Sequence, residues 1–196
     1  MVYADYDPVV THGSALLTVP ERSVMVRADL RRPGELLAHP GVRGFLDLSR
    51  PVAVMLIAIL HFVPDSDDPH GIVPALRDGL APGSYLAMVH LSGDFVEQHA
   101  AAEAVSIYEH ASARLRPPSR AEILRFFDGF ELVPPGLVPE HEWRPDGGGP
   151  GYRTSNVSRG AVGRKNAPSA GACAGGYRCR PAASSGPRVT GFLPCG

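Results

Sequence analysis

The chain has 196 residues, of which 44% are hydrophobic and 20% charged, enough apolar material for a globular domain with its own core. A net charge of -1 and a pI near 6.7 argue against a nucleic-acid binder driven by bulk charge. The longest apolar run, Pro51–Leu60, is about half of what a bilayer crossing needs. Acidic residues interrupt the N-terminus where a signal peptide would be apolar. These features predict a soluble, cytoplasmic protein without a membrane partner.

The composition changes sharply near the C-terminus. Residues 1–146 hold 12 basic and 20 acidic residues, whereas 147–196 hold 7 basic and no acidic ones. Cys173, Cys179 and Cys195 all lie in this last segment, and their spacing is not that of a zinc site. From 166 onward Gly, Ala, Pro and Ser dominate, which is typical of disorder. We therefore expect one domain over 1–165 and a disordered, low-complexity tail over 166–196.

Strands and helices are expected to alternate along the domain. The first strand is Val2–Ala4, ending at Asp5, and the helix after it has Asp7 as a possible N-cap and Pro8 in its first turn. Ser119 and Glu122 have the spacing of a capping box at the start of a later helix. The further expected elements are a strand over 23–30, a helix over 33–48 broken at Pro40, a strand over 51–60, a helix over 72–80, a strand over 82–91, a helix over 94–115, a strand over 130–135 and an edge strand over 152–165.

The run "PVAVMLIAIL" (51–60) is continuously apolar rather than alternating. Such a strand is typical of the middle of a parallel sheet that helices cover on both faces. Together with the alternation of strands and helices, it predicts an α/β fold with a doubly wound, mostly parallel sheet.

In open parallel sheets, ligands bind beyond the carboxyl ends of the strands. Asp5 follows the first expected strand, and its two carboxylate oxygens suit the hydroxyls of a ribose. The alternative is that Asp5 or Asp7 caps the next helix, and we assign the cap to Asp7. Asp29 could accept a hydrogen bond from an adenine amine while Leu30 covers the ring, although spacing alone fits an ordinary loop acid equally well.

His61 directly follows the apolar strand and is the candidate base, although a histidine at a strand end is more often a packing residue. The cluster Asp65, Asp67, Asp68 and His70 contains metal-ligand types, but it suits the polar cap of the next helix better, so no metal is expected. One feature is missing: nothing before Asp5 supplies the glycine-rich turn that nucleotide-binding sheets of this type carry after their first strand.

Several blocks of the chain together resemble the actinobacterial S-adenosylmethionine-dependent methyltransferase family once listed as a domain of unknown function. The resemblance runs from Val2 to Lys165. The blocks are "VYADYDPVV", "ADLRRPGELLAHPGVRGFLDLSRPVAVMLIAILHFVPDSDDPHGIVPALRDGLAPGSYLAMVHLS", "RAEILRFFDGFELVPPGLVPEHEWRPD" and "GAVGRK".

This resemblance implies a Rossmann-like, class I methyltransferase fold, with one antiparallel strand near the edge of the sheet, and a bound S-adenosylmethionine. Asp5 falls on the acid that grips the ribose, and Tyr6 lies beside the adenine. Asp29 and Leu30 fall on the adenine-edge pair. The segment Ala58–His61 falls beside the methionine moiety and the methyl acceptor, which we expect to be a small or medium-sized molecule.

The family's N-terminal helices, first strand and glycine loop have no counterpart here, so we expect an N-terminally truncated domain with a gap in its sheet. The tail from Asn166 is foreign to the family, as a frameshift or an extension would be. Two other functions stay open: an inactive remnant or binding module, and a dinucleotide-dependent oxidoreductase. The sequence predicts neither the acceptor nor the oligomeric state.

Overall fold

In the computed structural model, which describes residues 1–6, 9–95, 117–145 and 157–167, the strands form two sheets. The first pairs β1 (Val2–Asp5) with β2 (Val24–Arg27) in parallel. The second has the order β3-β4-β7-β5, with β6 pairing β7 beside this path. Its strands are β3 (Ala53–Ile57), β4 (Tyr85–Leu91), β5 (Phe130–Leu132), β6 (Val138–Pro139) and β7 (Ser158–Lys165).

Helices connect the strands. The α-helices are α1 (Val9–Leu17), α2 (Pro33–Ala38), α3 (Pro40–Phe45), α4 (Pro69–Asp78) and α6 (Arg120–Arg125). The 3-10 helices are η1 (Leu60–Phe62), η2 (Asp65–Asp67), η3 (Gly93–Phe95) and η4 (Glu140–Glu142). None of the helices within the described residues is long and apolar enough to cross a membrane.

The second sheet mixes parallel and antiparallel pairs. β3 and β4 run parallel, whereas β7 is antiparallel to β4, β5 and β6. The expected Rossmann-like sheet with one antiparallel strand is therefore confirmed. The expectation that the last strand lies at the edge is wrong, because β7 sits between β4 and β5. Gly163 of β7 allows a close neighbour, because a Cβ at this position would lie 2.8 Å from the ring of Phe127.

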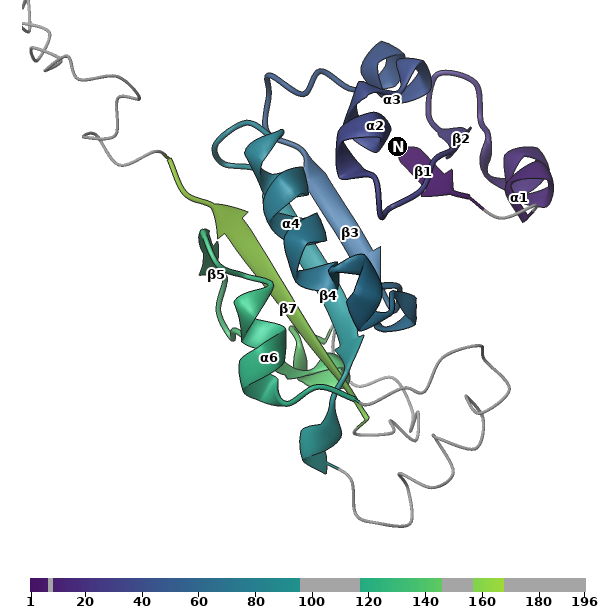
Figure 1. Cartoon of the computed structure of the whole chain (residues 1–196). Coiled ribbons are helices and arrows are strands. Elements are labelled where there is room, and N and C mark those ends of the chain that lie inside the picture. Colours follow the sequence, from purple (N-terminus) through teal and green to yellow (C-terminus); the bar gives the residue numbers. More distant parts are fainter. Residues whose placement is uncertain (7–8, 96–116, 146–156, 168–196) are drawn as a thin grey trace, which may run out of the picture.

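The larger core cluster lies between the second sheet and helices α4 and α6, which cover one face of the sheet (Figure 1). Leu56 and Leu86 point into this core from the strands, and Ile72, Val73 and Ile123 meet them from the helices. At the C-terminal end of β7, the ammonium of Lys165 donates to the carbonyls of Arg77 and Leu80, both at 2.7 Å. The end of β7 thus caps the C-terminus of α4.

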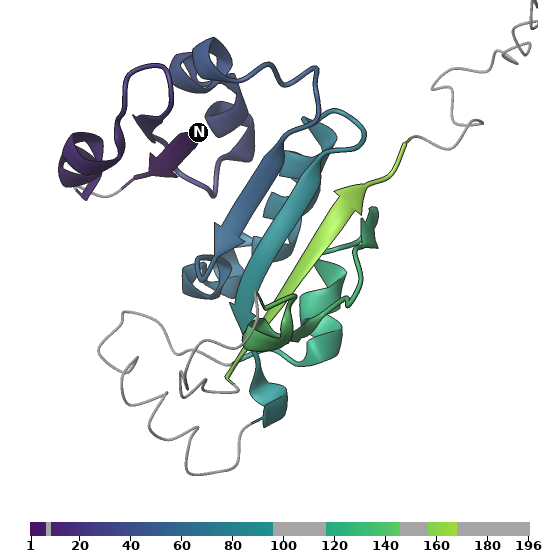
Figure 2. The ribbon, with the colours of Figure 1, turned by 180° about the vertical axis from the view of Figure 1, so that it is seen from behind.

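The expected burial of β3 on both faces is wrong for the described residues. Leu56 is 5% exposed, but Met55 and Ile57 on the opposite face are 63% and 49% exposed. Figure 2 shows the sheet from that side, with no described α-helix across β3 and β4; only the 3-10 helix η4 approaches this face, where Glu140 lies beside Gly160 of β7. Period-2 geometry sends alternate side chains to opposite faces, and the described α-helices cover only one face of this sheet.

The expected gap in the sheet is present, because β1 and β3 are each hydrogen-bonded to one neighbour only among the described strands. Both strands run in the same general direction in Figures 1 and 2. A second core cluster joins the two sheets, with Val26 of β2, Val42 of α3 and Leu80 buried together and Val54 of β3 packed against them. Apolar packing, rather than strand pairing, therefore holds β2 and α3 against the second sheet.

Local signals explain most of the helices. The helix expected after the first strand is α1, and the break expected at Pro40 separates α2 from α3. The capping box is confirmed: Ser119 Oγ accepts from the Glu122 N–H at 3.3 Å, and Glu122 Oε2 accepts from the Ser119 N–H at 2.8 Å. The second strand, expected over 23–30, ends earlier, at Arg27. Asp7, most of the expected helix over 94–115 and nearly all of the tail lie outside the described residues.

Candidate functional site

The carboxyl ends of β1 and β2 bring two predicted site residues together. In the parallel register, Asp5 lies opposite Arg27. The N–H of Ala28 donates to the carbonyl of Asp5 at 2.9 Å, so the chain leading to Asp29 passes directly beside the end of β1. Asp5 and Asp29 therefore lie at the same edge of this sheet, as the sequence predicts.

Asp29 is held by an arginine that the sequence analysis missed. The Arg31 guanidinium donates from Nε to Oδ1 at 2.9 Å and from Nη2 to Oδ2 at 2.6 Å. The Arg31 backbone N–H also donates to Oδ1, at 2.9 Å. Hydrogen bonds from Arg31 keep the pKa of Asp29 below its usual value. A basic residue two positions after a strand-end acid is the signal that could have indicated this pair.

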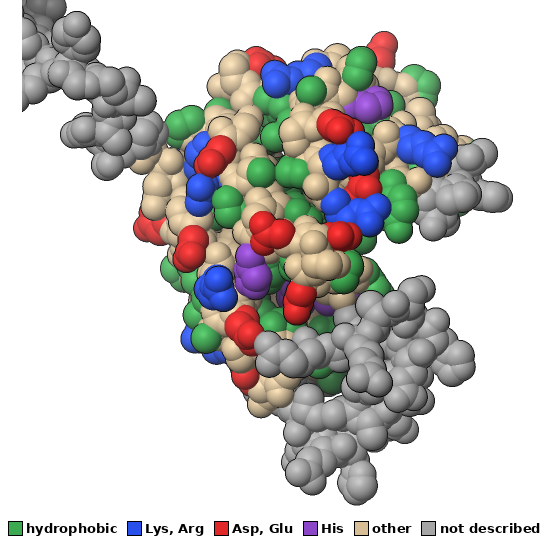
Figure 3. Space-filling model, viewed as in Figure 1, with side chains coloured by type: hydrophobic (Ala, Val, Ile, Leu, Met, Phe, Trp, Pro, Cys, Tyr) green, Lys and Arg blue, Asp and Glu red, His purple; other side chains and the backbone are tan. Residues whose placement is uncertain are grey.

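Arg31 also connects three loops. Its Nη1 donates to Asp67 Oδ2 at 3.1 Å, in the η2 turn that follows β3. Its guanidinium carbon lies 5.2 Å from the centre of the Tyr6 ring, directly after β1. Figure 3 shows basic and acidic side chains interspersed over this N-terminal part of the molecule. One side chain thus links the segments that follow β1, β2 and β3.

The predicted adenine neighbours differ in exposure. Tyr6 is 56% exposed, and its backbone N–H donates to Asp5 Oδ1 at 2.7 Å, which orients that carboxylate. Leu30 is half-buried and packs against the main core. The two residues of the predicted adenine-edge pair thus have different roles in the free chain: Asp29 is ion-paired, and Leu30 anchors the loop.

The chain turns abruptly where β3 ends. Ala58 has φ 54°, in the left-handed region, and its N–H donates to the carbonyl of Val89 at 3.0 Å. A non-glycine residue there costs about 1 kcal/mol, and such residues cluster at binding sites. The turn leads within two residues into η1, which carries His61.

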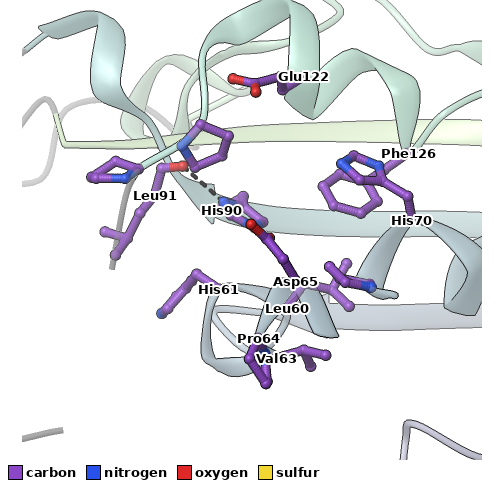
Figure 4. Close-up of a pocket in the computed structure, with 13 residues that line it drawn as sticks. Leu60, His61, Val63, Pro64, Asp65, His70, His90, Leu91, Glu122 and Phe126 are labelled. Carbon is purple, nitrogen blue, oxygen red and sulfur yellow. Dashed lines mark hydrogen bonds between the residues drawn. The ribbon is translucent and has the colours of Figure 1, made fainter. Parts of the chain in front are cut away.

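His61 lies at the rim of a cavity of about 260 Å³ between η1, α4, β4 and α6 (Figure 4). Its ring centre is 5.4 Å from that of His90, in an edge-on arrangement. Phe126, the C-cap of α6, stacks with His90 at 5.6 Å and with His70 of α4 at 4.3 Å. The structure thus groups three histidines at the carboxyl end of β4, although the sequence analysis proposed a role only for the first.

Two of these histidines, His61 and His90, favour their neutral forms. Burial lowers the pKa of His61 to about 4, with a smaller effect from His90. Burial also lowers the pKa of His90, against a hydrogen bond with the Leu91 carbonyl that raises it. That carbonyl lies 2.8 Å from His90 Nδ1 and can only accept, so Nδ1 carries the proton and neutral His90 keeps its lone pair on Nε2.

The acidic cluster after His61 has structural uses. Asp68 caps α4, because its Oδ1 accepts from the Gly71 N–H at 3.0 Å, as the capping alternative predicts. Asp67 accepts from Arg31. Across the described part of the chain, no group of three or more His, Cys, Asp or Glu side chains has a metal-binding arrangement.

Comparison with known proteins decides the family. The model of the S-adenosyl methyltransferase family matches residues 1–166. This chain belongs to that family. A DUF574 family protein from Streptomyces avermitilis has 42% sequence identity and a TM-score of 0.75, with 84% of this chain and 64% of that chain covered. A proposed methyltransferase from Thermobifida fusca has 38% identity and a TM-score of 0.73, with 85% and 63% covered.

The chain thus spans under two thirds of the length of these two relatives. A SAM-dependent methyltransferase from Methanosarcina mazei, at 11% identity and a TM-score of 0.54 over 84% of this chain and 81% of that one, shares the fold. No curated protein matches the chain.

The residues at the strand ends suit the family's cofactor. The nucleoside part of S-adenosylmethionine presents hydroxyl and amine hydrogens, and ionised carboxylates such as Asp5 and Asp29 accept hydrogen bonds without donating any. Asp29 retains accepting capacity beside Arg31, because each carboxylate oxygen can accept more than one hydrogen bond. The side chains present therefore fit the adenosine end of the cofactor.

Proposed function

We propose that this chain binds S-adenosylmethionine beyond the carboxyl ends of β1, β2 and β3 and transfers its methyl group to a small or medium-sized acceptor. The supporting observation is that Arg31 links Asp29, after β2, to Tyr6, after β1, and to Asp67, after β3. In this proposal Asp5 binds the ribose, while Tyr6, Asp29 and Leu30 surround the adenine.

The segment Ala58–His61 would lie beside the methionine moiety. The cofactor supplies a methyl group on a positively charged sulfur, which leaves as a neutral thioether when a lone pair of the acceptor takes the methyl. The chain then has mainly to align the acceptor and take up its proton. Neutral His61 can orient an acceptor hydroxyl or amine and receive that proton, and its low pKa keeps it neutral at physiological pH.

Calorimetric titration of the purified chain with S-adenosylmethionine tests this proposal. We expect binding, and we expect Asp5→Asn to weaken it about tenfold or more, because the amide removes an accepting oxygen opposite a hydroxyl. Asp78→Asn is the matched control: Asp78 pairs with Arg77 at the C-terminal end of α4, outside the proposed site. Absence of heat at millimolar ligand would refute cofactor binding by this chain.

Parallel experiments separate the remaining functions. An oxidoreductase would bind NAD in the same titration, whereas we expect no binding of NAD. A non-catalytic module would bind S-adenosylmethionine but give no methylated product with any acceptor, which mass spectrometry of incubations with small amines and alcohols would detect. The interruption between β1 and β3 is the observation that favours the module as second candidate. The cytoplasmic location stays a prediction from the sequence.

A further inference from the structure

The cavity beside His61 is lined by apolar residues, histidines and carboxylates. Eight of the 13 described residues that line it are apolar: Leu60, Val63, Pro64, Pro69, Leu91, Pro117, Pro118 and Phe126. The other five are the three histidines of the cluster, Asp65 and Glu122. Neither Lys nor Arg is among the described residues that line it. Figure 3 shows histidine and acidic side chains next to one another in the middle of the face turned to the viewer.

The polar atoms of this wall are mainly hydrogen-bond acceptors. Ionised Asp65 and Glu122 have no hydrogen to donate. Glu122 Oε2 already accepts from Ser119, which fixes the side chain of Glu122 within the capping box. His90 uses its Nδ1–H on the Leu91 carbonyl and therefore offers only the lone pair of Nε2. A ligand that fits such a wall must bring the hydrogens itself.

Charge narrows the class of ligand further. A carboxylate or phosphate in the cavity would face two negative side chains and find no cation among the described lining residues. An ammonium or amine brings several N–H donors and is attracted by the same two carboxylates. The eight apolar residues and the stacked ring of Phe126 suit a hydrocarbon or aromatic body.

We infer that this cavity is the acceptor site and that it takes a small apolar amine, which binds as the ammonium and must lose one proton to solvent water before its nitrogen lone pair can take the methyl group. That the bound amine is the methyl acceptor rests on the methyl transfer proposed above. That the cavity binds an amine does not depend on that proposal. The position supports the role: η1 begins shortly after the end of β3, so His61 belongs both to the proposed cofactor segment and to the wall of the cavity (Figure 4). Phe126, the C-cap of α6, and His70 of α4 would contact the body of the amine.

Three probes of nearly equal size and different charge test the inference: benzylamine, benzyl alcohol and benzoate. Each is titrated into the full chain with labelled histidines, and NMR follows the imidazole signals. Benzylamine should shift the signals of His61, His70 and His90 and bind at least about tenfold more tightly than benzoate. The imidazoles of His39 and His141, which do not line the cavity, serve as internal references.

A charge variant adds a second readout. Asp65→Asn should weaken benzylamine about threefold and leave benzyl alcohol unchanged, because Asp65 is exposed and its attraction is partly screened. Equal binding of benzoate and benzylamine, or an absence of shifts at the three histidines with benzylamine, would overturn the inference.

Adding S-adenosylmethionine to the same samples distinguishes the two proposals. Cofactor binding without amine binding would refute the amine site and leave the proposed function in place. Amine binding without cofactor binding would support the amine site and refute the methyl transfer.

Discussion

The Arg31 guanidinium grips both oxygens of Asp29, with Nη2 2.6 Å from Oδ2 and Nε 2.9 Å from Oδ1. The same side chain reaches Asp67 at 3.1 Å, so it ties the loop after β2 to the turn that follows β3. No strand pairing among the described residues connects these two sheets. The ion pairs of Arg31 therefore add a polar link between two segments of the proposed cofactor site, beside the apolar packing that joins the sheets.

Replacing this arginine should affect binding more than folding. The side chains of Arg31 and Asp29 are 42% and 23% exposed, and pairs of this kind contribute about 1 kcal/mol or less to stability. We expect Arg31→Met to change the free energy of unfolding within that range and to weaken S-adenosylmethionine binding about tenfold, since Asp29 loses its orientation. Urea unfolding and calorimetry measure the two effects.

The neighbouring Arg32 provides the control for Arg31. It pairs with Glu35 at 3.3 Å, and both of these side chains are more than half exposed. Arg32→Met should leave cofactor affinity unchanged. An equal loss in both variants would show that general surface charge, rather than the grip on Asp29, decides the affinity.

The backbone of Ala58 should respond to glycine. With φ 54°, the Cβ of Ala58 is sterically strained against the backbone, and glycine has no Cβ and would not be. We expect Ala58→Gly to raise the free energy of unfolding by up to about 1 kcal/mol, as measured by urea denaturation. Ala53→Gly, at the start of β3, should instead lower it, because glycine within a strand costs entropy. Destabilisation by Ala58→Gly would contradict the left-handed turn.

The histidine cavity should make stability depend on pH. Folding lowers the pKa of His61 from 6.5 to about 4, so between these values the unfolded chain binds more protons than the folded chain. Stability is then fully present above pH 6.5 and is lost as the pH falls toward 4. His61→Phe should reduce this loss by about 1 kcal/mol, once solvent screening is allowed for, without abolishing it, because the pKa of His90 is lowered too.

NMR titration of the imidazoles checks this directly. The His61 signal should change with a midpoint near 4, since burial disfavours the charged ring. A midpoint at the ordinary value of 6.5 would contradict the burial of His61.

The core beneath the cavity should be sensitive to truncation. Leu60 is 1% exposed and packs in the main core, one residue before His61. We expect Leu60→Ala to lower the free energy of unfolding by about 2–4 kcal/mol, since it leaves a hole that the rigid surroundings cannot fill. Leu16→Ala, at a position that is 81% exposed, should change it by less than about 0.5 kcal/mol in the same urea titration. Similar losses for both would contradict the assignment of the core.

Local signals in the sequence predicted much of the fold. The capping box of Ser119 and Glu122, the helix α1 and the break at Pro40 depend on residues a few positions apart, so the sequence alone identifies them. The exposure of Met55 and the central place of β7 depend on which distant segments pair. The apolar letters of β3 do not reveal that one of its faces meets no described helix, and the Gly and Arg content of β7 resembles an edge strand.

In the candidate site, too, residues with a local sequence signal were predicted and contacts between distant segments were not. Asp5 is the last residue of β1 and Asp29 lies two residues after β2, and both were predicted because ligands bind at the carboxyl ends of parallel strands. The contacts of Arg31 with Asp67 and Tyr6 were not predicted, because these residues lie in other loops, and the grouping of His61, His70 and His90 arises only when β4, α4 and η1 pack together. Interactions between residues far apart in the chain carry no local pattern.

The most direct measurement is the map of backbone amide shifts on addition of S-adenosylmethionine to the labelled chain. The proposed site predicts the largest shifts at Asp5 and Tyr6, at Asp29 and Leu30, and over Ala58–His61. The C-terminal end of α4 and the strand β5 should stay unchanged. Shifts confined to those two regions, or none at saturating ligand, would contradict the assignment of a methyl-donor site to the ends of β1, β2 and β3.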